Sequence, residues 1–358
     1  MDFSTQFPVL NNCTYLNTAG SGIISQSIRQ WRQEHDEDYV RQGSRFRLQQ
    51  AEFLEDVRQH VALFFHASAA NTFLVQNFSL GFNIFLNGLS QDHQFLLLQG
   101  DYPSVNYPVV SRGFPHAYVT ADENLEQNIL DAIARFKPTI LALSLVQYTT
   151  GLRVNLAFLK RLKEEYPGML IVADGTQFCG TCDFNFEASG CDVLIGSGYK
   201  WMLSGYGNGF VLIKDNVIPH VYQDRLSRSL PAESFLKHKK LLSLCFEPGH
   251  LDTLNFGSLK QSILFLETLG FDLIEKRIWS ISKMAKDAFM ERGLLSAEQA
   301  QRDEPTAIFK LKAEEALLQR MNAANILFTH RGEGLRLSFH FYNDEQDIGY
   351  LLKTIDGN

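Results

Sequence analysis

The chain has few cysteines, no long apolar run and no basic cluster in its 358 residues. Five cysteines are an odd number for so large a chain, which argues against a disulfide framework. No stretch approaches the ~20 apolar residues that cross a bilayer, and the first residues show neither the basic nor the apolar region of a signal peptide. We therefore expect no membrane association and, by default, a cytoplasmic location.

The charge balance and two short motifs narrow the partners further. A net charge of -7 without a basic cluster argues against nucleic acid, although a local positive pocket for an anion stays possible. Cys179 and Cys182 have CxxC spacing, but no second pair and no histidine at ligand spacing lie nearby, so we expect a structural role and no metal. The glycine-rich loop 205–209 precedes a strand and lacks the dinucleotide register, which predicts a turn close to a ligand.

From about residue 70 the chain alternates strands and helices. Two segments, 124–136 and 156–165, have apolar residues at the three- and four-residue spacing of amphipathic helices. The expected strands are continuous apolar runs with β-branched residues, at 72–76, 94–99, 139–146, 170–174, 193–196 and 210–214. Such runs fit strands covered by helices on both faces, so we predict an α/β domain with a mostly parallel sheet.

The pattern changes after about residue 250, where strands and helices follow one another less regularly. Helices are expected at 258–269, 273–292, 314–321 and 344–355, and strands at 307–312, 326–330 and 335–339. This order predicts a smaller α+β domain. Pro231 and Pro248 interrupt the region 225–250 between the two patterns. We expect a large domain over 15–245 and a small one over 250–358 together with 1–14.

Polar or aromatic residues follow five of the predicted strands. They are 77–79, 101–102, Gln147, Asp174 and 197–200. Ligands bind at the carboxyl ends of strands in open α/β sheets. We therefore expect these residues to meet at one edge of the sheet.

Asp174 and Lys200 carry the strongest chemical signal. Asp174 ends one apolar strand, and the next strand runs into an SGYK turn that ends at Lys200. Pyridoxal phosphate needs such a pair: a lysine that holds it as a Schiff base and later moves the α-proton, and an acid that keeps the pyridine nitrogen protonated. A phosphate-binding P-loop is excluded because Trp201 follows the lysine. The alternatives are a surface lysine and, for Asp174, a helix N-cap.

The phosphate of such a cofactor needs amide groups at a helix start. Residues 77–83 fit, because polar and small residues separate a strand from a helix there. Phe78 and Ser79 are the expected contacts, Ser197 offers a hydroxyl, and Tyr199 is a further donor. An ordinary capped helix is the alternative for this segment.

Two residues are expected on the cofactor ring. Tyr102 is placed to stack on the pyridine ring, which stabilises binding by roughly 1 kcal/mol. Gln177 lies three residues beyond Asp174 and could hydrogen-bond the phenolic oxygen. The alternatives are a core aromatic and a surface glutamine.

Arg336 is the candidate for the substrate. It lies on a predicted strand between apolar neighbours, and an inward-pointing arginine is costly without an anionic partner. A substrate carboxylate held by two parallel hydrogen bonds would suit, and a protein acid is the alternative. Arg331 is a weaker candidate for the same role.

Together these motifs resemble the class V aminotransferase family of fold-type I pyridoxal-phosphate enzymes. That group includes cysteine desulfurases, selenocysteine lyases, kynureninases and isopenicillin-N-epimerase-like proteins. The matching segments are YLNTAG (15–20), DYPS (101–104), ADGTQ (173–177), SGYKWML (197–203) with GNGF (207–210), and LRLSFHFYN (335–343). The resemblance implies a seven-stranded, mostly parallel sheet with a smaller C-terminal α+β domain. It also places Asn17 and Ala19 beside the substrate.

The resemblance further implies a homodimer with each active site at the subunit interface. Residues 247–250 are similar to the segment through which the partner subunit contacts the phosphate, with His250 where the family often has threonine. Tyr199 replaces the usual histidine before the lysine. Desulfurases of this family carry a persulfide-forming cysteine in the small domain, whereas 253–358 contains none, which argues against persulfide-based desulfuration.

The sequence thus predicts a pyridoxal-phosphate enzyme acting on an amino acid or small amine. Transamination is the first expectation, and cysteine-independent β-elimination, as in a selenocysteine lyase, or epimerisation the next. A non-catalytic α/β protein that binds a phosphorylated ligand is the alternative from another class.

Overall fold

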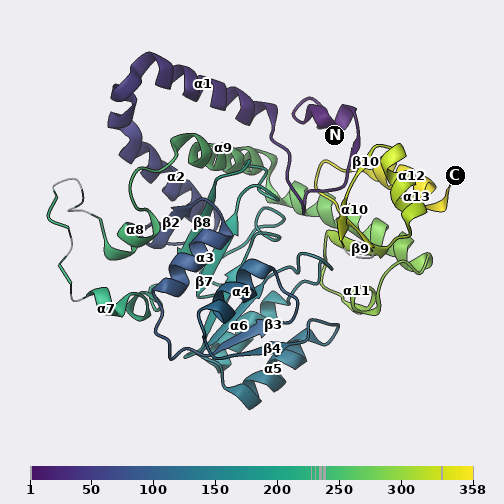
Figure 1. Cartoon of the computed structure of the whole chain (residues 1–358). Coiled ribbons are helices and arrows are strands. Elements are labelled where there is room, and N and C mark those ends of the chain that lie inside the picture. The colour runs from purple at the N-terminus through teal and green to yellow at the C-terminus, as the bar shows by residue number, and fades with distance from the viewer. Residues whose placement is uncertain are drawn as a thin grey trace.

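The structure, a computed structural model, describes residues 2–226, 228–229, 231–233, 236, 239–331 and 334–357. Its centre is a seven-stranded sheet of order β2-β8-β7-β6-β5-β3-β4 (Figure 1). Only β8 runs antiparallel to its neighbours. The strands are β2 (Thr72–Val75), β3 (Phe95–Leu98), β4 (His116–Val119), β5 (Ile140–Ser144), β6 (Leu170–Asp174), β7 (Val193–Ser197) and β8 (Gly209–Ile213).

Six of these strands confirm the sequence prediction, and β4 was missed. The sequence of β4, HAYV, contains no apolar run, because the strand lies at the edge of the sheet and its Tyr118 is exposed. The mostly parallel α/β architecture is confirmed.

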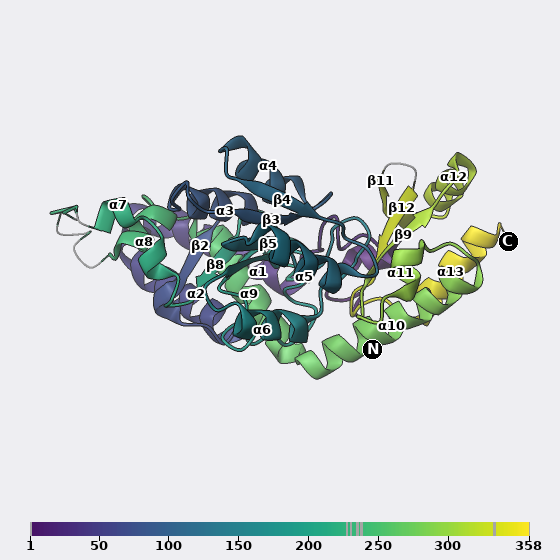
Figure 2. The same ribbon diagram turned by 90° about the horizontal axis from the view of Figure 1, so that it is seen from below.

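Helices cover both faces of this sheet (Figure 2). Alternate residues of the strands belong to two separate apolar clusters, one on each face, as the period of two in a strand requires. One cluster includes residues of α3 (Phe78–Asn87), α4 (Pro103–Ser111) and α8 (Leu241–Phe246). The other includes residues of α2 (Gln50–Phe64), α5 (Leu125–Phe136), α6 (Leu156–Glu165) and α9 (Thr253–Leu269).

The C-terminal part forms an antiparallel three-stranded sheet of order β11-β12-β9 with its own apolar cluster. Its strands are β9 (Ile308–Lys312), β11 (Thr329–Arg331) and β12 (Gly334–Ser338), and its helices are α10 (Phe271–Glu291), α11 (Ala297–Gln301), α12 (Glu315–Ala323) and α13 (Glu345–Asp356). The smaller α+β unit is confirmed. The single strand expected over 326–330 was wrong, because β10 (Ile326–Leu327) pairs with β1 (Thr14–Tyr15) whereas β11 pairs with β12.

The N-terminal segment connects both units. After β1, Asn17 forms a bridge to Ser338, and the chain continues into α1 (Gln26–Gln42), whose first turn is capped by Ser25. The sequence did not predict α1, since only Ile28 of this helix is buried. The remaining short elements are η1 (Pro8–Asn11), η2 (Gly43–Gln49), η3 (Ala69–Asn71), η4 (Ile218–His220) and α7 (Gln223–Leu226).

The limits of the two domains stay a prediction. Helix α9 lies in the range assigned to the small domain, yet its Phe256, Leu259 and Ile263 pack beneath the large sheet. The expected join, 225–250, is partly outside the described residues. Within the described part of the chain, no helix is long and apolar enough to span a bilayer.

Candidate active site

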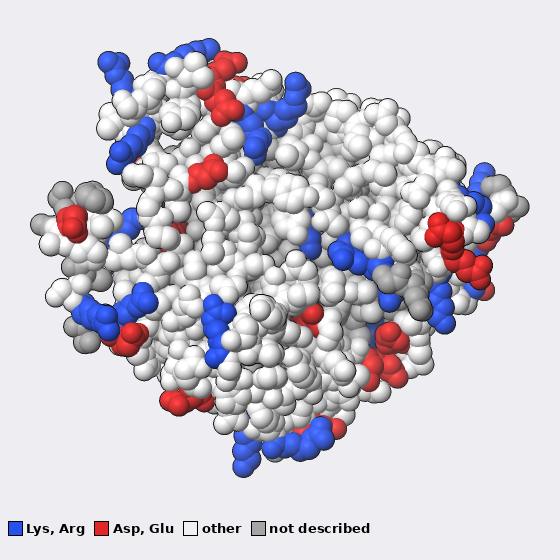
Figure 3. All heavy atoms as spheres, viewed as in Figure 1, with Lys and Arg blue, Asp and Glu red and all other residues white. Residues whose placement is uncertain are grey.

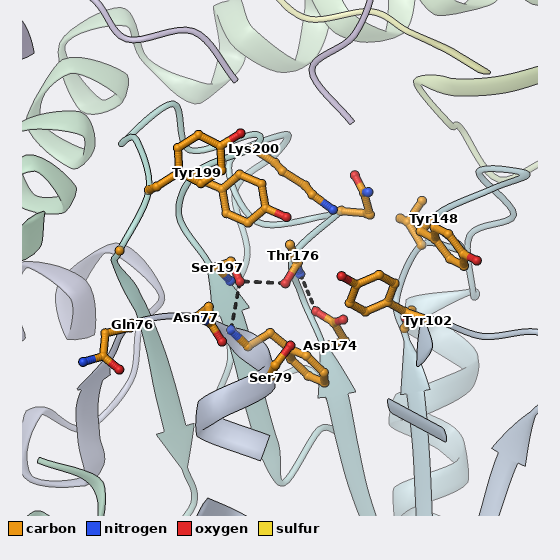
Figure 4. A pocket seen from close by; sticks show the side chains of 16 residues that line it. Gln76, Asn77, Ser79, Tyr102, Tyr148, Asp174, Thr176, Ser197, Tyr199 and Lys200 are labelled. Carbon is orange, nitrogen blue, oxygen red and sulfur yellow. Dashed lines mark hydrogen bonds between the residues drawn. The ribbon is translucent and has the colours of Figure 1, made fainter. Parts of the chain in front are cut away.

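The carboxyl ends of five strands lie at one edge of the large sheet. Because β2 and β7 are both antiparallel to β8, they point the same way as the parallel strands beside them. A cavity of about 250 Å³ lies at this edge (Figure 4). Its lining includes Asn77, Phe78, Ser79, Tyr102, Ser144, Tyr148, Asp174, Thr176, Gln177, Ser197, Tyr199, Lys200 and Tyr206.

All five predicted strand ends reach the cavity, that of β5 through Ser144 and Val146, but Gln147 itself does not line it. Its side chain instead closes a local turn, donating to Gly100 O over 2.8 Å and accepting from Thr149 N over 3.0 Å. The next residue, Tyr148, lines the cavity in its place. Sequence alone does not distinguish between these neighbours, because the direction of a side chain after a strand depends on the turn that follows.

Close backbone contacts fix the turn that carries Lys200. A Cβ on Gly22 would lie 2.1 Å from Lys200 O, and Gly22 N donates to Tyr199 O over 2.8 Å. A Cβ on Gly198 would lie 2.2 Å from the side chains of Ser204 and Asn208. Glycine is therefore needed at both positions. The result is a lysine only 7% exposed, whose amine points into the cavity (Figure 4).

The surroundings of Lys200 weaken its hold on a proton. Its Nζ lies 5.7 Å from the ring centroid of Tyr102 and 5.4 Å from that of Tyr199. The pKa of Lys200 is lowered to about 8, chiefly by burial; the charge of Asp174 opposes this shift, and the charges of Arg336 and Arg331 add to it. An amine with such a pKa is partly neutral near neutral pH, which suits a nucleophile and a general base.

Asp174 is a buried acid at the end of β6. One carboxylate oxygen, Oδ1, accepts a hydrogen bond from Thr176 N over 2.8 Å. Burial raises the pKa of Asp174 to about 7, and nearby Asp101 contributes in the same direction. Asp101 is itself held by the backbone amide and hydroxyl of Ser144, at 2.8 and 2.6 Å. The carboxylate of Asp174 therefore lacks a strong cationic partner, and a protonated ring nitrogen in the cavity would supply one.

The start of helix α3 forms the opposite end of the cavity. Asn77 caps the helix by accepting from Leu80 N over 2.9 Å, and Phe78 N donates to Ser197 Oγ over 2.8 Å. Ser197 N in turn donates to Thr176 Oγ1 over 3.2 Å. Among the described residues, the Ser79 amide has no acceptor. The free Ser79 amide at this helix N-terminus, beside the Ser197 hydroxyl, is suited to a phosphate.

Tyr102 and Gln177 line the cavity between these two ends. The ring of Tyr102 meets that of Tyr148 edge to face, with centroids 5.3 Å apart. The Gln177 amide donates to Ala19 O over 3.0 Å, and its oxygen accepts from the Trp201 indole over 2.7 Å. Both residues are therefore held in place, and one amide hydrogen of Gln177 is left over.

Arg336 lies behind Tyr148, with 1% of its surface exposed. Its Nη1 donates to Tyr148 O over 2.6 Å and its Nη2 to Thr329 Oγ1 over 3.4 Å. Its buried Nε has no partner, and no carboxylate within the described ranges lies within ion-pair distance. Burial and the charge of Arg331 lower the pKa of Arg336 to about 10. The protein acid considered as an alternative from the sequence is thus absent from the described structure.

Like Arg336, three further expected contacts, Asn17, Ala19 and His250, lie outside the cavity lining. Asn17 accepts from Thr329 Oγ1 over 2.5 Å, and Ala19 N donates to Ser338 Oγ over 2.9 Å. Both therefore hold neighbouring residues of the same chain in position. His250 lines a different hollow, and its expected contact with a partner's phosphate stays a prediction.

Sequence reasoning missed several lining residues, of which Thr176 and Tyr206 are informative. Thr176 connects Asp174 to Ser197 and lies within the matched motif ADGTQ, so a signal was present. Tyr206 stacks on Tyr199 at 4.8 Å between centroids, and its hydroxyl donates to Ser21 Oγ over 3.1 Å. It lies in the glycine-rich loop 205–209, which the sequence predicted to be close to a ligand, although the aromatic side chain itself was not singled out.

The cysteines are free and none lines the cavity. Burial raises the pKa of Cys179 and Cys182, so both are poor thiolates. No cluster of potential metal ligands was found among the described residues.

Comparisons of this sequence with known proteins agree on one family. The model of the family "Aminotransferase class-V" matches residues 14–351. A probable cysteine desulfurase of Borreliella burgdorferi is 22% identical over 302 residues, which cover 75% of this chain and 70% of the relative. An isopenicillin N epimerase of Amycolatopsis lactamdurans is 26% identical over 208 residues, 52% of each chain.

Solved structures share the fold. The cysteine desulfurase of Thermococcus onnurineus superposes with a TM-score of 0.84 at 17% identity, covering 99% of this chain and 96% of that one. The cystine C-S lyase C-DES, in complex with its reaction product cysteine persulfide, gives a TM-score of 0.84 at 18% identity, with 98% and 99% covered.

The cavity fits the cofactor of this family, pyridoxal 5'-phosphate. It offers a partly neutral lysine amine at Lys200, a buried carboxylate without a strong partner at Asp174, and the free Ser79 amide beside the Ser197 hydroxyl at the start of α3. These are the groups needed for the aldehyde, the ring nitrogen and the phosphate. The chain belongs to the class V aminotransferase family of pyridoxal-phosphate-dependent enzymes.

Proposed function

We propose that this protein is a pyridoxal-phosphate-dependent lyase that removes the α-proton of an amino acid and then releases its β-substituent. The observation that carries the first half is the partly neutral amine of Lys200 in a cavity that also contains Asp174, with the unpaired Arg336 behind its wall. The names of the relatives, which include desulfurases and a C-S lyase, support the second half.

Each residue has a defined task in this proposal. When bound, pyridoxal phosphate supplies an electron sink for the α-carbanion. Asp174 holds the proton on the ring nitrogen, and the start of α3 with Ser197 binds the phosphate. Arg336 binds the α-carboxylate, which fixes the α-hydrogen toward Lys200. Lys200 Nζ, released by the substrate amine, accepts the α-proton, and the β-substituent leaves with its bonding electrons.

The positions of the cysteines decide what happens to the released group. None of the five lines the cavity, and the sequence has no cysteine beyond Cys245. We therefore expect the group to leave as a free small molecule instead of passing to a protein thiol.

Transamination, the first expectation from the sequence, is the second candidate. It would share the removal of the α-proton by Lys200 and differ in that the β-substituent would stay on the substrate while the amino group would be passed to an acceptor. The family description supports it.

One experiment separates these reactions. The protein is loaded with pyridoxal phosphate, its visible absorbance is recorded, and L-cysteine, L-cystine or L-alanine is added. From L-cysteine we expect sulfide, ammonia and a keto acid without any amino acceptor, and from L-cystine a persulfide in place of sulfide. L-alanine, which has no β-substituent to release, should give no keto acid without an acceptor. Keto acid formed in a single turnover only, or only with an added acceptor, would favour transamination. Inverted stereochemistry at the α-carbon of the recovered amino acid would favour epimerisation. A protein that stays colourless would favour phospholigand binding without catalysis.

We further propose that the protein is a homodimer in which His250 faces the partner subunit's cofactor. The support for this is the position of the histidine: within one chain it lies away from the cavity, beside Glu247 and Lys239, so it could contact a cofactor only in a partner subunit. Analytical ultracentrifugation would give twice the monomer mass, and a monomer that retains full activity would contradict this.

A further inference from the structure

Two neighbours fix the side-chain amide of Gln177 in a single orientation. Its Oε1 accepts a hydrogen bond from the indole Nε1 of Trp201 over 2.7 Å, and its Nε2 donates to Ala19 O over 3.0 Å. An indole N–H can only donate and a carbonyl oxygen can only accept, so exchanging the amide nitrogen and oxygen would break both bonds. The second hydrogen on Nε2 is therefore the one available to a group in the cavity, which Gln177 lines.

The ring of Trp201 is in turn held by His340. The two rings stack with centroids 5.4 Å apart and 25° between their planes, and His340 stacks on Tyr342 at 5.1 Å and 12°. Phe341 N donates to His340 Nδ1 over 2.8 Å, so the ring proton lies on Nε2, which donates to Trp201 O over 3.0 Å. Burial lowers the pKa of His340 to about 4, so the ring stays neutral and keeps both bonds at neutral pH.

This chain of contacts is shielded from solvent. Gln177, Trp201 and His340 are 5%, 1% and 0% exposed. In such surroundings a hydrogen bond to an oxygen with negative charge is stronger than at the surface, and leaving it unmade costs more. The orientation of one amide therefore changes the pKa of a group that it faces: an N–H directed at an oxygen lowers the pKa of that oxygen, and a carbonyl oxygen in the same place raises it.

We propose that Trp201 is a positioning residue, whose indole N–H keeps Gln177 turned so that an amide hydrogen, and not the amide oxygen, faces the phenolic oxygen of pyridoxal phosphate. The inference rests on the proposed function, because it assigns a role toward the cofactor of that reaction. A donor at the phenolic oxygen stabilises its anionic form, which lowers the pKa of the proton that this oxygen shares with the Lys200 nitrogen. The visible absorbance of the loaded protein changes with the position of that proton.

The test is a pH titration of the visible absorbance of the full chain loaded with pyridoxal phosphate. Trp201→Phe keeps a buried aromatic ring and removes the N–H group, so the amide of Gln177 is free to turn. The midpoint of the titration should rise by about one pH unit or more, which corresponds to the loss of one hydrogen bond to a charged oxygen. An unchanged midpoint would overturn the role of Trp201.

A double-mutant cycle separates this role from a loss of packing. Gln177→Leu removes the amide and should raise the midpoint by itself, and Trp201→Phe should then add nothing. A further rise in the leucine background would show a packing effect and overturn the proposal.

Trp279→Phe is the matched control for the removal of an indole. Trp279 lines the same small hollow as Gln177 and Trp201, but its N–H group bonds Glu275, so the midpoint should stay unchanged. A rise as large as that of Trp201→Phe would overturn the specific role. All these substitutions replace one neutral side chain by another. The surface charges, with Lys and Arg interspersed among Asp and Glu on the face in Figure 3, are therefore the same in every variant.

The unmutated protein provides a second measurement if Trp201→Phe does not fold. The chain has three tryptophans, so isotope-labelled protein gives three indole N–H signals in a magnetic resonance spectrum. Trp31→Phe and Trp279→Phe identify two of them, and the third belongs to Trp201. Since hydrogen bonds in a chain polarise one another, this signal should shift with pH at the same midpoint as the absorbance. A signal that does not follow the absorbance would overturn the proposal.

The two proposals fail in different ways. A loaded protein that shows the expected midpoint shifts but releases no sulfide from L-cysteine would overturn the lyase reaction and leave the role of Trp201 standing. Sulfide release together with an unchanged midpoint in Trp201→Phe would overturn that role alone. A protein that stays colourless with added pyridoxal phosphate would overturn both.

Discussion

The two walls of the cavity differ in how their polar groups are satisfied. On the side of the large sheet, Asp174, Thr176, Ser197 and the start of α3 form a continuous chain of hydrogen bonds. On the side of the small sheet, Arg336 keeps an unpartnered Nε and Arg331 has no ion pair among the described residues. The first wall is held together by its own hydrogen bonds, whereas the second leaves a buried arginine nitrogen without a partner.

This difference separates cofactor binding, which members of the family have in common, from substrate selection, which is particular to each enzyme. A wall fixed by its own hydrogen bonds positions the same cofactor whatever the substrate is. In a wall with unpaired cations, the identity and position of those cations determine which substrate binds. The following substitutions test that separation, beginning with the largest expected effect.

Lys200→Ala should reduce turnover by about 10³-fold or more, because it removes both the attachment point and the base. Borohydride reduction followed by mass spectrometry should find the cofactor bound covalently in the wild type and not in the variant. Restored turnover with added primary amines would support the role as a base. Unchanged turnover would remove Lys200 from the mechanism.

Asp174→Asn should change the pH dependence of stability in the cofactor-free protein. The pKa of Asp174 rises from 3.8 to about 7 through burial, so between these values the folded state holds a proton that the unfolded chain has lost. Stability of the wild type should therefore fall as pH rises, by about 2–3 kcal/mol between roughly pH 5 and pH 7.

The asparagine variant should lack that slope, since it does not titrate and can still accept from Thr176 N. Lys200 contributes little in this window because its pKa of about 8 lies above it. Urea denaturation at several pH values measures the effect. Parallel slopes for the two proteins would place the titrating group elsewhere.

Arg336→Ala should raise KM for amino acids by about 10- to 100-fold, the value of one charge-assisted pair of hydrogen bonds. The absorbance of the bound cofactor should stay the same, because this wall does not hold the cofactor. Arg336→Lys, which keeps the charge without the planar fork, should recover only part of the loss. A variant that loses the cofactor absorbance would break the distinction between the two walls.

Tyr102→Leu should have the smallest effect, a loss of about five-fold in cofactor affinity from the missing ring stacking. The edge-to-face contact with Tyr148 would also be lost. Titration of the apoprotein with pyridoxal phosphate measures it. A much larger loss would mean that Tyr102 holds Tyr148, and through it the substrate wall, in place.

The sequence was a good guide to the first wall and a poorer one to the second. Asp174 and Lys200 end buried apolar strands, and a parallel sheet brings such ends together, so local pattern alone places them. Tyr148 reaches the site through a turn, and Arg331 reaches Tyr148 through a strand pairing that splits 326–331 in two. Such long-range pairings leave no periodic trace in the sequence.

The same limit explains Asn17 and Ala19, which matched the family motif yet lie outside the cavity lining. Their side-chain and backbone bonds go to Thr329, Ser338 and Gln177, contacts between residues far apart in the chain. Spacing within the motif could not show where those partners would lie.

The extended N-terminal segment has a mechanical consequence. Its β1 pairs with β10, Asn17 forms a bridge to Ser338, and Gly22 packs against the backbone of Tyr199 and Lys200. One stretch of chain is thus fastened at one end to the small sheet and at the other to the loop of the reactive amine. A rigid-body tilt of the small sheet would therefore also displace that loop, and with it the position of the Lys200 amine.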